Sequence, residues 1–513
     1  MKGSVIMVQG TASSVGKSLL VTGLCRLLQR RGLSVAPFKA QNVSLNSFVT
    51  REGHEIGRAQ ATQAQAARIE PSVDMNPVLL KPEGGAGMQA IVMGKPYASP
   101  LAQDPTARKR MLSDIVKGCL DRLRAEYDVV VIEGAGSPAE INLRERDIVN
   151  MHVALMVSAP VLLVGDIDRG GVFAHFVGTL ELLQAEERAL VAGLVINKFR
   201  GDKRLLYSGV ELIEERTGVK MVGIVPHLEN LRIADEDAVS LDHRPSSRGA
   251  PGAVDIAVVR FPRISNFDDF LALEHEPGVN VRYVESAAEL LGADLVILPG
   301  TKDTRSDLRW MRKVGIDTVI LERARSQAPV LGICGGYQML GQSIDDPLAL
   351  EGSAGAEDGL GLLPIRTVYK AAKTTTRVHA KANANEGSFL LKGVPVGETL
   401  EGYEIHMGDV AALDGGPWLF EHEGQRGEGK AEGSVAGTLL HGLFDNDALR
   451  GHLLAGLGRD PQAAGSNAHA STVDEEYDRL ADVLEQHLDM EYIDQLLAAS
   501  GLEGPASPKD ASE

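Results

Sequence analysis

The sequence predicts an α/β protein made of two doubly wound domains, each a parallel sheet with helices on both faces, followed by a helical tail. Three observations predict this class. The length of 513 residues is too great for one ordinary domain. Short apolar runs alternate with longer helical patterns, and an unbroken apolar run is typical of a strand buried on both faces. The runs form two series, separated by a polar segment rich in Pro, Gly and Ser.

The two series and the break between them give the expected domain limits. Strands of the first series are predicted at Val5–Val8, Val129–Ile132, Val161–Val164 and Leu194–Ile196. Those of the second are predicted at Val254–Val259, Leu295–Leu298 and Val330–Ile333. We therefore expect domains at residues 1–239 and 253–455, a linker at 240–252, and an extension with a frayed tail at 456–513. One amphipathic packing helix is predicted in the extension from Tyr477, Leu480, Leu484, Leu488, Tyr492 and Leu496.

Charge and composition exclude several classes of function. The formal net charge is −18 and no contiguous basic segment is present, so neither nucleic acid nor an anionic membrane is an expected partner. No run of about 18 apolar residues occurs, so no membrane span is expected. Three cysteines are too few for a disulfide framework, which favours a cytoplasmic protein. The opening MKGSVIMVQG runs into a glycine-rich loop and is predicted to be a first strand rather than a signal peptide.

A glycine-rich turn between the first strand and the first helix predicts a phosphate site. Backbone N–H groups of such a loop, with the positive end of the helix, bind phosphate oxygens. Lys17 is expected to reach the terminal phosphates of ATP, and Ser18 to ligate Mg²⁺. Five residues, rather than the usual four, separate Gly10 from Gly16. A tight turn that merely needs glycine is the alternative. The predicted nucleotide-binding residues of the loop are Gly10, Thr11, Val15, Gly16, Lys17 and Ser18.

Polar residues also follow three other predicted strands. Glu133 ends the run VVVIE, and the carboxyl ends of parallel strands face the crevice where ligands bind. Glu133 is therefore a predicted Mg²⁺ ligand, with a cap for the next helix as the alternative. Asp166 and Asp168 are candidates to hold metal or substrate, and a turn with its own ion pair explains them equally well. Asn197 is a candidate contact to the nucleotide base.

The stretch from residue 39 to residue 81 is rich in amides. A surface of this kind suits a substrate with carboxylate or amide arms, but spacing favours a solvated helix face equally, and both interpretations stay open. The candidate substrate residues are Lys39, Gln41, Asn42 and Ser44.

Cys334 lies where an apolar strand runs directly into a helix, in LGICGGYQML. Glycines on both sides allow a sharp turn that lifts the thiol to the helix N-terminus, where its pKa is lowered. The N–H of Gly335 then faces a developing oxyanion. Cys25 and Cys119 lie within helical, partly apolar stretches and are expected to be inert core thiols.

A free thiol has a pKa of about 8.5 and needs a base at neutral pH. His441 ends another apolar run, about a hundred positions after Cys334, which suits a Cys–His pair. Gly300, in the Pro299–Thr301 turn after a third strand, is the predicted second oxyanion donor.

Together these segments resemble the cobyric acid synthase family, the glutamine-dependent amidases of the cobalamin pathway. The resemblance covers nearly the whole chain and rests on QGTASSVGKS, FKAQNVSLNS, GRAQATQAQAA, MNPVLLKP, IEGAGSPAEINL, GDIDRGGVFA, LPGTKDT, LGICGGYQML, GYEIHMG and LLHGLFDN. It implies a dethiobiotin-synthetase-like P-loop amidoligase domain, whose longer phosphate loop matches the extra residue, and a class I-type glutamine amidotransferase domain. It also implies that Cys334 is the nucleophile and His441 its base.

One position departs from the wider class. Many class I glutaminases have a glutamate two residues after the histidine, where this chain has Leu443. Absence of that acid fits the branch that amidates cobyric and cobyrinic acids, but it leaves open what orients His441. Glu404 and His406 are candidates.

The resemblance implies four amidations, at the b, d, e and g carboxylates of the corrinoid adenosylcobyrinic acid a,c-diamide. Each would use one L-glutamine and one ATP with Mg²⁺, through an acyl phosphate. The alternative within this branch is cobyrinic acid a,c-diamide synthase, which FKAQNVSLNS and GSPAEINL favour less. CTP synthase keeps the third acid. A partition-type P-loop ATPase is the alternative from another class, although it has no need of a Cys–His pair.

Overall fold

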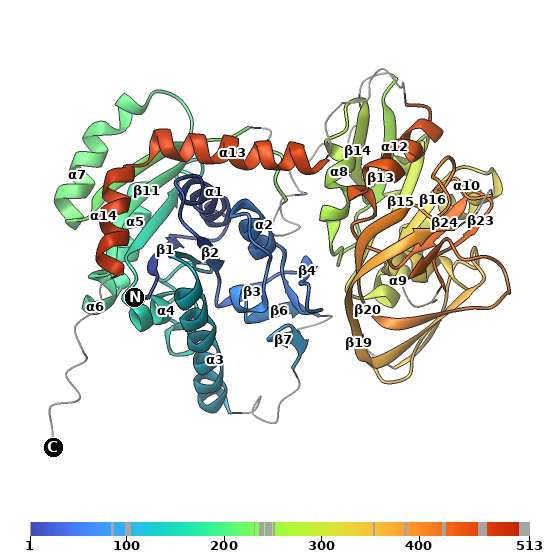
Figure 1. Cartoon of the computed structure of the whole chain (residues 1–513), viewed down its shortest axis with the longest axis horizontal. Helices are drawn as coiled ribbons and strands as arrows, with labels where there is room; N and C mark the ends of the chain where they lie inside the picture. The colour runs from blue at the N-terminus through green and yellow to red at the C-terminus, as the bar shows by residue number, and fades with distance from the viewer. Residues whose placement is uncertain are drawn as a thin grey trace.

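The computed structural model describes residues 2–83, 87–97, 104–229, 231–234, 241, 249, 252–351, 354–383, 387–422, 427–459 and 469–501. Figure 1 shows two α/β bodies side by side, joined across one face by a long helix near the C-terminus. We refer to residues up to 234 as the N-terminal half and to residues 252–459 as the C-terminal half. Most of the predicted linker, residues 240–252, lies outside the described residues.

The N-terminal half is built on a six-stranded sheet whose strand pairs are all parallel. Each predicted strand of the first series lies in it. The register places Val8 opposite Glu133, so the loop after β1 begins beside that carboxylate. In spatial order the strands are β12 (Lys220–Pro226), β11 (Val191–Phe199), β10 (Val161–Asp166), β1 (Ser4–Gly10), β9 (Val129–Glu133) and β2 (Val35–Phe38).

Both faces of this sheet are buried, which explains the unbroken apolar runs. Val5 and Met7 of β1 belong to the core on one face, whereas Ile6 and Val8 belong to the core on the other. The helices of this half are α1 (Lys17–Arg30), α2 (Arg58–Ala66), α3 (Pro105–Glu126), α4 (Met151–Val157), α5 (Val172–Leu182), α6 (Ala185–Arg188) and α7 (Tyr207–Thr217). Short 3-10 turns occur at Val73–Met75, Arg144–Arg146 and Lys203–Leu206.

Two small sheets extend the N-terminal half toward the C-terminal half (Figure 1). One contains β3 (Gln41–Val43), β6 (Val78–Pro82), β7 (Met88–Val92) and β8 (Lys95–Pro96). The other pairs β4 (Ser47–Val49) with β5 (Glu55–Gly57). The amide-rich stretch thus forms a structured lobe with buried side chains rather than a single solvated helix face.

The C-terminal half contains a second six-stranded sheet, parallel except for one edge strand. Its order is β14 (Val279–Val284), β13 (Val254–Val259), β15 (Leu295–Leu298), β16 (Val330–Ile333), β24 (Val435–Thr438) and β23 (Lys430–Glu432). Its helices are α8 (Leu271–Glu274), α9 (Thr304–Lys313), α10 (Ile316–Arg325), α11 (Gly335–Leu340) and α12 (Asp447–Gly456), with 3-10 turns at Phe267–Phe270, Ala287–Leu290 and Leu443–Asp445. The predicted α/β class is confirmed for both halves.

A further sheet in the C-terminal half was not predicted. Its strands are β17 (Ser343–Asp346), β18 (Gly355–Asp358), β19 (Ile365–Ala382), β20 (Thr399–Ala412), β21 (Phe420–His422) and β22 (Gly427–Glu428). The long antiparallel pair β19–β20 dominates it. This sheet brings the backbone of Ile405 to within 3.7 Å of the Cys334 sulfur.

The C-terminal extension forms two helices, so the prediction of one helix was wrong. Helix α13 (His469–His487) ends before α14 (Met490–Ser500) begins. The helix is interrupted there because Leu488 forms a β-bridge with Gly223, and the Asp489 amide donates to the Val222 carbonyl at 2.8 Å. These bonds cover the exposed edge of β12.

Both helices of the extension return to the N-terminal half. Leu484 and Ile493 are buried in the core beneath α1, and Arg26 of α1 forms a 2.9 Å ion pair with Asp478. Figure 1 shows α13 crossing from beside α8 to lie along α1. Among the described residues, none of the helices has the length and apolar character required to cross a bilayer.

Candidate active sites

The phosphate loop joins β1 to α1 in a conformation that requires glycine. Gly16 has a φ of 97°, and a Cβ atom there would lie 2.2 Å from Nδ2 of the Asn197 side chain. Asn197 also donates to the Val15 carbonyl at 2.8 Å, so it supports the loop from β11. Its contact with a nucleotide base stays a prediction.

Lys17 and Thr11 lie on the inner side of the loop. The Lys17 ammonium donates to the carbonyls of Ala12 and Gly136, each at 3.1 Å, and therefore spans the mouth of the loop. The Thr11 hydroxyl is buried without a hydrogen-bond partner among the described residues. A buried hydroxyl and a buried ammonium at the N-terminus of a helix fit the phosphate groups of a nucleotide.

Glu133 is the centre of the polar contacts beside the loop. Its fully buried carboxylate accepts hydrogen bonds from Ser18 at 2.9 Å, Lys39 at 2.7 Å and Gln63 at 2.5 Å. These partners come from α1, from the residue after β2 and from α2, an arrangement that differs from the helix-cap alternative. One carboxylate and one hydroxyl fit Mg²⁺, which keeps several waters and binds phosphates. Within the described ranges no cluster of three or more His, Cys, Asp or Glu residues suits a metal.

Asp166 and Asp168 form a turn with its own ion pairs, and a contact of either residue with metal or substrate stays a prediction. Asp166 accepts from Lys198 at 2.9 Å and from the Asp168 amide at 2.9 Å. Asp168 pairs with Arg200 at 3.6 Å. Lys198 donates in addition to the Ser14 carbonyl at 2.7 Å, so this turn buttresses the phosphate loop.

Cys334 occupies the sharp turn predicted between β16 and α11. Its φ of 51° and ψ of −107° are strained for a residue with a side chain. Gly336 permits this turn, because a Cβ there would lie 1.9 Å from the Leu298 carbonyl oxygen. A Cβ on Gly335 would lie 3.2 Å from the Thr301 amide nitrogen. A Cβ on Gly300 would lie 3.2 Å from Cε1 of His441. Gly335 therefore lies against the Gly300–Thr301 turn, and the Gly300 oxyanion donor stays a prediction.

Cys334 and His441 line the same pocket, and both side chains are buried. Its backbone exchanges two hydrogen bonds with Tyr403, whose ring stacks on the imidazole at 5.1 Å between centroids. The structure therefore brings the two predicted residues together.

Asp269 is the functional residue that sequence reasoning missed. Its Oδ2 atom lies 2.7 Å from Nδ1 of His441, and its Oδ1 atom accepts from the Gly442 amide at 2.9 Å. Burial opposes the charged imidazolium, but the Asp269 carboxylate and Cys334 outweigh it and raise the pKa of His441 well above its usual range. The acidic pair in SNFDDF, just after β13, was the available signal.

Glu404 and His406 do not orient His441, which corrects the sequence-based suggestion. The Glu404 carboxylate lies 3.2 Å from Nε2 of His406, and Nδ1 of His406 lies 2.8 Å from the Gly408 carbonyl oxygen. The Cys25 and Cys119 thiols are buried as expected, and burial raises the pKa of Cys119 to about 12.

Comparisons with known proteins agree with this two-site arrangement. The model of the CobQ/CobB/MinD/ParA nucleotide binding domain matches residues 6–241, and that of the CobB/CobQ-like glutamine amidotransferase domain matches residues 255–449. A cobyric acid synthase of Sorangium cellulosum is 54% identical over 97% of this chain and 99% of its own. The cobyric acid synthase of Desulforudis audaxviator is 48% identical over 97% of this chain and 100% of its own. That of Dehalococcoides mccartyi strain CBDB1 is 47% identical over 96% of this chain and 98% of its own. The chain belongs to the cobyric acid synthase family.

Membership of the cobyric acid synthase family decides between the alternatives. The chain is an enzyme that combines a nucleotide-binding domain with a glutamine amidotransferase domain. A partition-type ATPase is excluded, because positioning cargo requires no glutamine amidotransferase domain. The cobyrinic acid a,c-diamide synthase alternative is disfavoured by the names of the relatives.

The predicted substrate residues of the amide-rich lobe lie in three different places. Gln41 lines a cavity of about 480 Å³ beside the phosphate loop. Asn42 and Ser44 are bonded within the lobe, Asn42 to Gln60 at 3.1 Å and Ser44 to the Asn46 amide at 3.0 Å. Lys39 is the ion-pair partner of Glu133.

Helix α2 contacts both candidate sites. Near its end, Gln63 donates to Glu133 at 2.5 Å. At its first residue, Arg58 forms a 3.2 Å ion pair with Asp268, the neighbour of Asp269. The adjoining loop adds a bond at 2.8 Å from the Asn266 amide to the Asn46 side chain. One short helix therefore connects the phosphate site with the Cys334 site.

Proposed function

We propose that this protein converts adenosylcobyrinic acid a,c-diamide to adenosylcobyric acid by amidating the b, d, e and g carboxylates. Each amide would use one L-glutamine and one ATP, in the cytoplasm. One observation carries the proposal: a Cys334–His441–Asp269 arrangement and a phosphate loop occur in one chain whose relatives are named cobyric acid synthases.

The C-terminal half would release ammonia from glutamine. The Cys334 thiolate attacks the side-chain carbonyl carbon, and the N–H groups of Gly335 and the Gly300–Thr301 turn stabilise the oxyanion. His441 gives its proton to the departing nitrogen, which leaves as ammonia, and a γ-glutamyl thioester remains. Water then attacks the thioester, His441 takes its proton, and glutamate leaves with the thiolate restored. Asp269 keeps the imidazole in the required orientation throughout.

The N-terminal half would activate the acid. A carboxylate resists ammonia because its leaving group would be oxide, and bound ATP with Mg²⁺ supplies the phosphoryl group that removes this obstacle. Lys17 and the loop N–H groups would bind and orient the phosphates. Ser18 and Glu133 would hold Mg²⁺, while Lys39 and Gln63 fix the position of the Glu133 carboxylate.

The cavity beside the phosphate loop suits a substrate with several carboxylates. Ser13 of the loop and Gly136, whose carbonyl accepts from Lys17, both line it. Its lining also carries three guanidinium groups and three carboxylates: Arg108, Arg144, Arg146, Glu140, Asp147 and Glu187. Arginine binds carboxylates with two parallel hydrogen bonds, so we place the corrinoid arms here.

Mass spectrometry of the product tests the proposal. The purified chain would receive glutamine, ATP and Mg²⁺ with either cobyrinic acid or its a,c-diamide. We expect four new amides on the a,c-diamide. Product from cobyrinic acid alone would reject the proposal in favour of the a,c-diamide synthase.

A further inference from the structure

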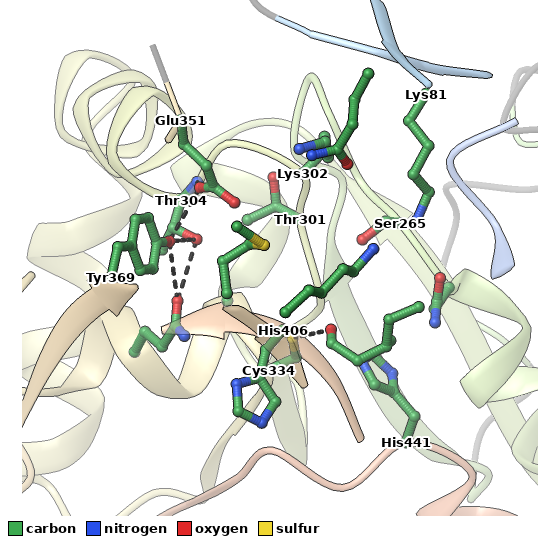
Figure 2. A pocket seen from close by; sticks show the side chains of 17 residues that line it. Lys81, Ser265, Thr301, Lys302, Thr304, Cys334, Glu351, Tyr369, His406 and His441 are labelled. Atoms are coloured by element: carbon green, nitrogen blue, oxygen red, sulfur yellow. Dashed lines mark hydrogen bonds between the residues drawn. The ribbon is translucent and has the colours of Figure 1, made fainter. Parts of the chain in front are cut away.

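The pocket above Cys334 is built by both halves of the protein. The C-terminal half supplies Cys334 and His441, whereas Lys81 of β6 and Gln89 of β7 come from the N-terminal half. Figure 2 shows Lys81 descending into the pocket on the side opposite Glu351, with Cys334 below and between them. Neither Lys81 nor Glu351 has a part in the thiol chemistry described above.

One side of this pocket carries an excess of positive charge. Lys81 lies 2.6 Å and Lys373 of β19 lies 2.5 Å from the carboxylate of Glu55, and all three side chains are buried. Two ammonium groups therefore share one carboxylate. Burial lowers the pKa of Lys81 to about 8, with Glu55 opposing this effect and Lys373 reinforcing it. Lys302 adds a further cation, paired at 3.6 Å with Glu83. A buried excess charge of this kind calls for an anionic partner.

The other side carries the partly buried carboxylate of Glu351. Glu351 accepts hydrogen bonds from the Tyr369 hydroxyl at 2.9 Å and from the Thr304 amide at 3.1 Å, both neutral donors. Burial raises the pKa of Glu351 to about 7, with Lys302 opposing the rise. An ammonium group bound here would restore the charged carboxylate.

We propose that the pocket binds the amino-acid end of glutamine, with its α-carboxylate at Lys81 and Lys373 and its α-ammonium at Glu351. This assignment rests on the proposed function, because glutamine enters the site with its side-chain amide at Cys334. The excess positive and negative charges on opposite sides of one pocket match a zwitterion. The N-terminal half therefore completes the glutamine site, through Lys81 and through Glu55, which holds both lysines.

Glutamine analogues that lack one charged group separate this role from a structural one. 4-Aminobutyramide lacks the α-carboxylate, and glutaramate lacks the α-ammonium. In the full chain, Lys81→Met should lower kcat/KM for glutamine hydrolysis about 30-fold or more, mainly through KM. Hydrolysis of 4-aminobutyramide should change by less than about threefold, because this analogue has no α-carboxylate for Lys81 to bind. Glu351→Gln should show the same selectivity, with glutaramate as the insensitive analogue.

A matched control and a second variant complete the design. Lys95→Met removes an exposed lysine of β8 that does not line the pocket, and it should leave both substrates unaffected. Lys373→Met should repeat the selectivity of Lys81→Met, and thermal unfolding checks that each variant folds. Equal losses for glutamine and 4-aminobutyramide, or no loss for either, would overturn the assignment while the glutaminase stands. An unsubstituted chain without glutaminase activity would overturn the proposed function first, and this assignment with it.

Discussion

The carboxylate of Asp269 lies 2.7 Å from Nδ1 of His441, although 172 positions separate them in the chain. It supplies the acid that many class I glutaminases carry two residues after the histidine, where this chain has the buried Leu443. The same carboxylate also binds the Gly442 amide. The Cys–His pair is therefore oriented from another segment of the fold, next to the contact between the two halves.

Asp269→Asn should lower kcat for glutamine hydrolysis at least about 100-fold, because the amide no longer stabilises the imidazolium or its tautomer. The release of glutamate is the measurement, and amidation driven by ammonium chloride is the internal control. Undiminished glutaminase activity would show that Asp269 has no role in orienting His441.

The pH profile of the same variant gives an independent test. Asp269 raises the pKa of His441 because its negative charge favours the imidazolium, so removing that charge should lower this pKa. The active thiolate–imidazolium pair would then lose its proton at lower pH. We expect the alkaline limb of kcat/KM for glutamine to move toward neutrality by about 1–3 pH units. An alkaline limb at its original pH would contradict this prediction.

Cys334→Ala should abolish the use of glutamine and leave amidation with high ammonium chloride, because the synthetase reaction needs ammonia rather than the thiol. Cys119→Ala, which removes a buried thiol far from His441 in the sequence, is the matched control and should keep both activities. Loss of both nitrogen sources in Cys334→Ala would mean that the cysteine is structural.

Arg58→Met should destabilise the contact between the halves, because it leaves the buried Asp268 carboxylate without its 3.2 Å partner. Breaking a buried ion pair costs about 3–5 kcal/mol, and urea unfolding measures this loss. The double variant Arg58→Met with Asp268→Asn should recover most of the stability, since no unpaired charge remains. A single variant as stable as the parent would show that the pair contributes nothing.

The features that sequence reasoning predicted correctly are local ones. The turn at Gly16 and the turn at Cys334 each join an adjacent strand and helix, and their glycines are required by contacts within or near the turn. The unbroken apolar runs, such as Val5–Val8, likewise report burial on both faces. Such signals are contained in a few consecutive residues.

The features that it missed depend on contacts between distant segments. The role of Asp269 depends on its hydrogen bond to His441. Lys81 lines a pocket whose cysteine and histidine belong to the other half of the chain. The interruption of the helix at Leu488 arises from its pairing with Gly223 at a sheet edge, and the helical spacing of apolar residues gives no sign of that pairing. The strands β19 and β20 are stabilised by each other, and their own pattern was not interpreted as strand.

The central claim is that ammonia freed at Cys334 is joined to a carboxylate that the phosphate loop activates. Its most direct test supplies glutamine carrying heavy nitrogen in the side-chain amide, with the a,c-diamide, ATP and unlabelled ammonium chloride at low concentration. Mass spectrometry should find heavy nitrogen in all four new amides that the parent forms. Cys334→Ala at high ammonium chloride should form only unlabelled amides. Lys17→Ala should form no new amides. Amides without heavy nitrogen in the parent, or normal amidation by Lys17→Ala, would contradict the account.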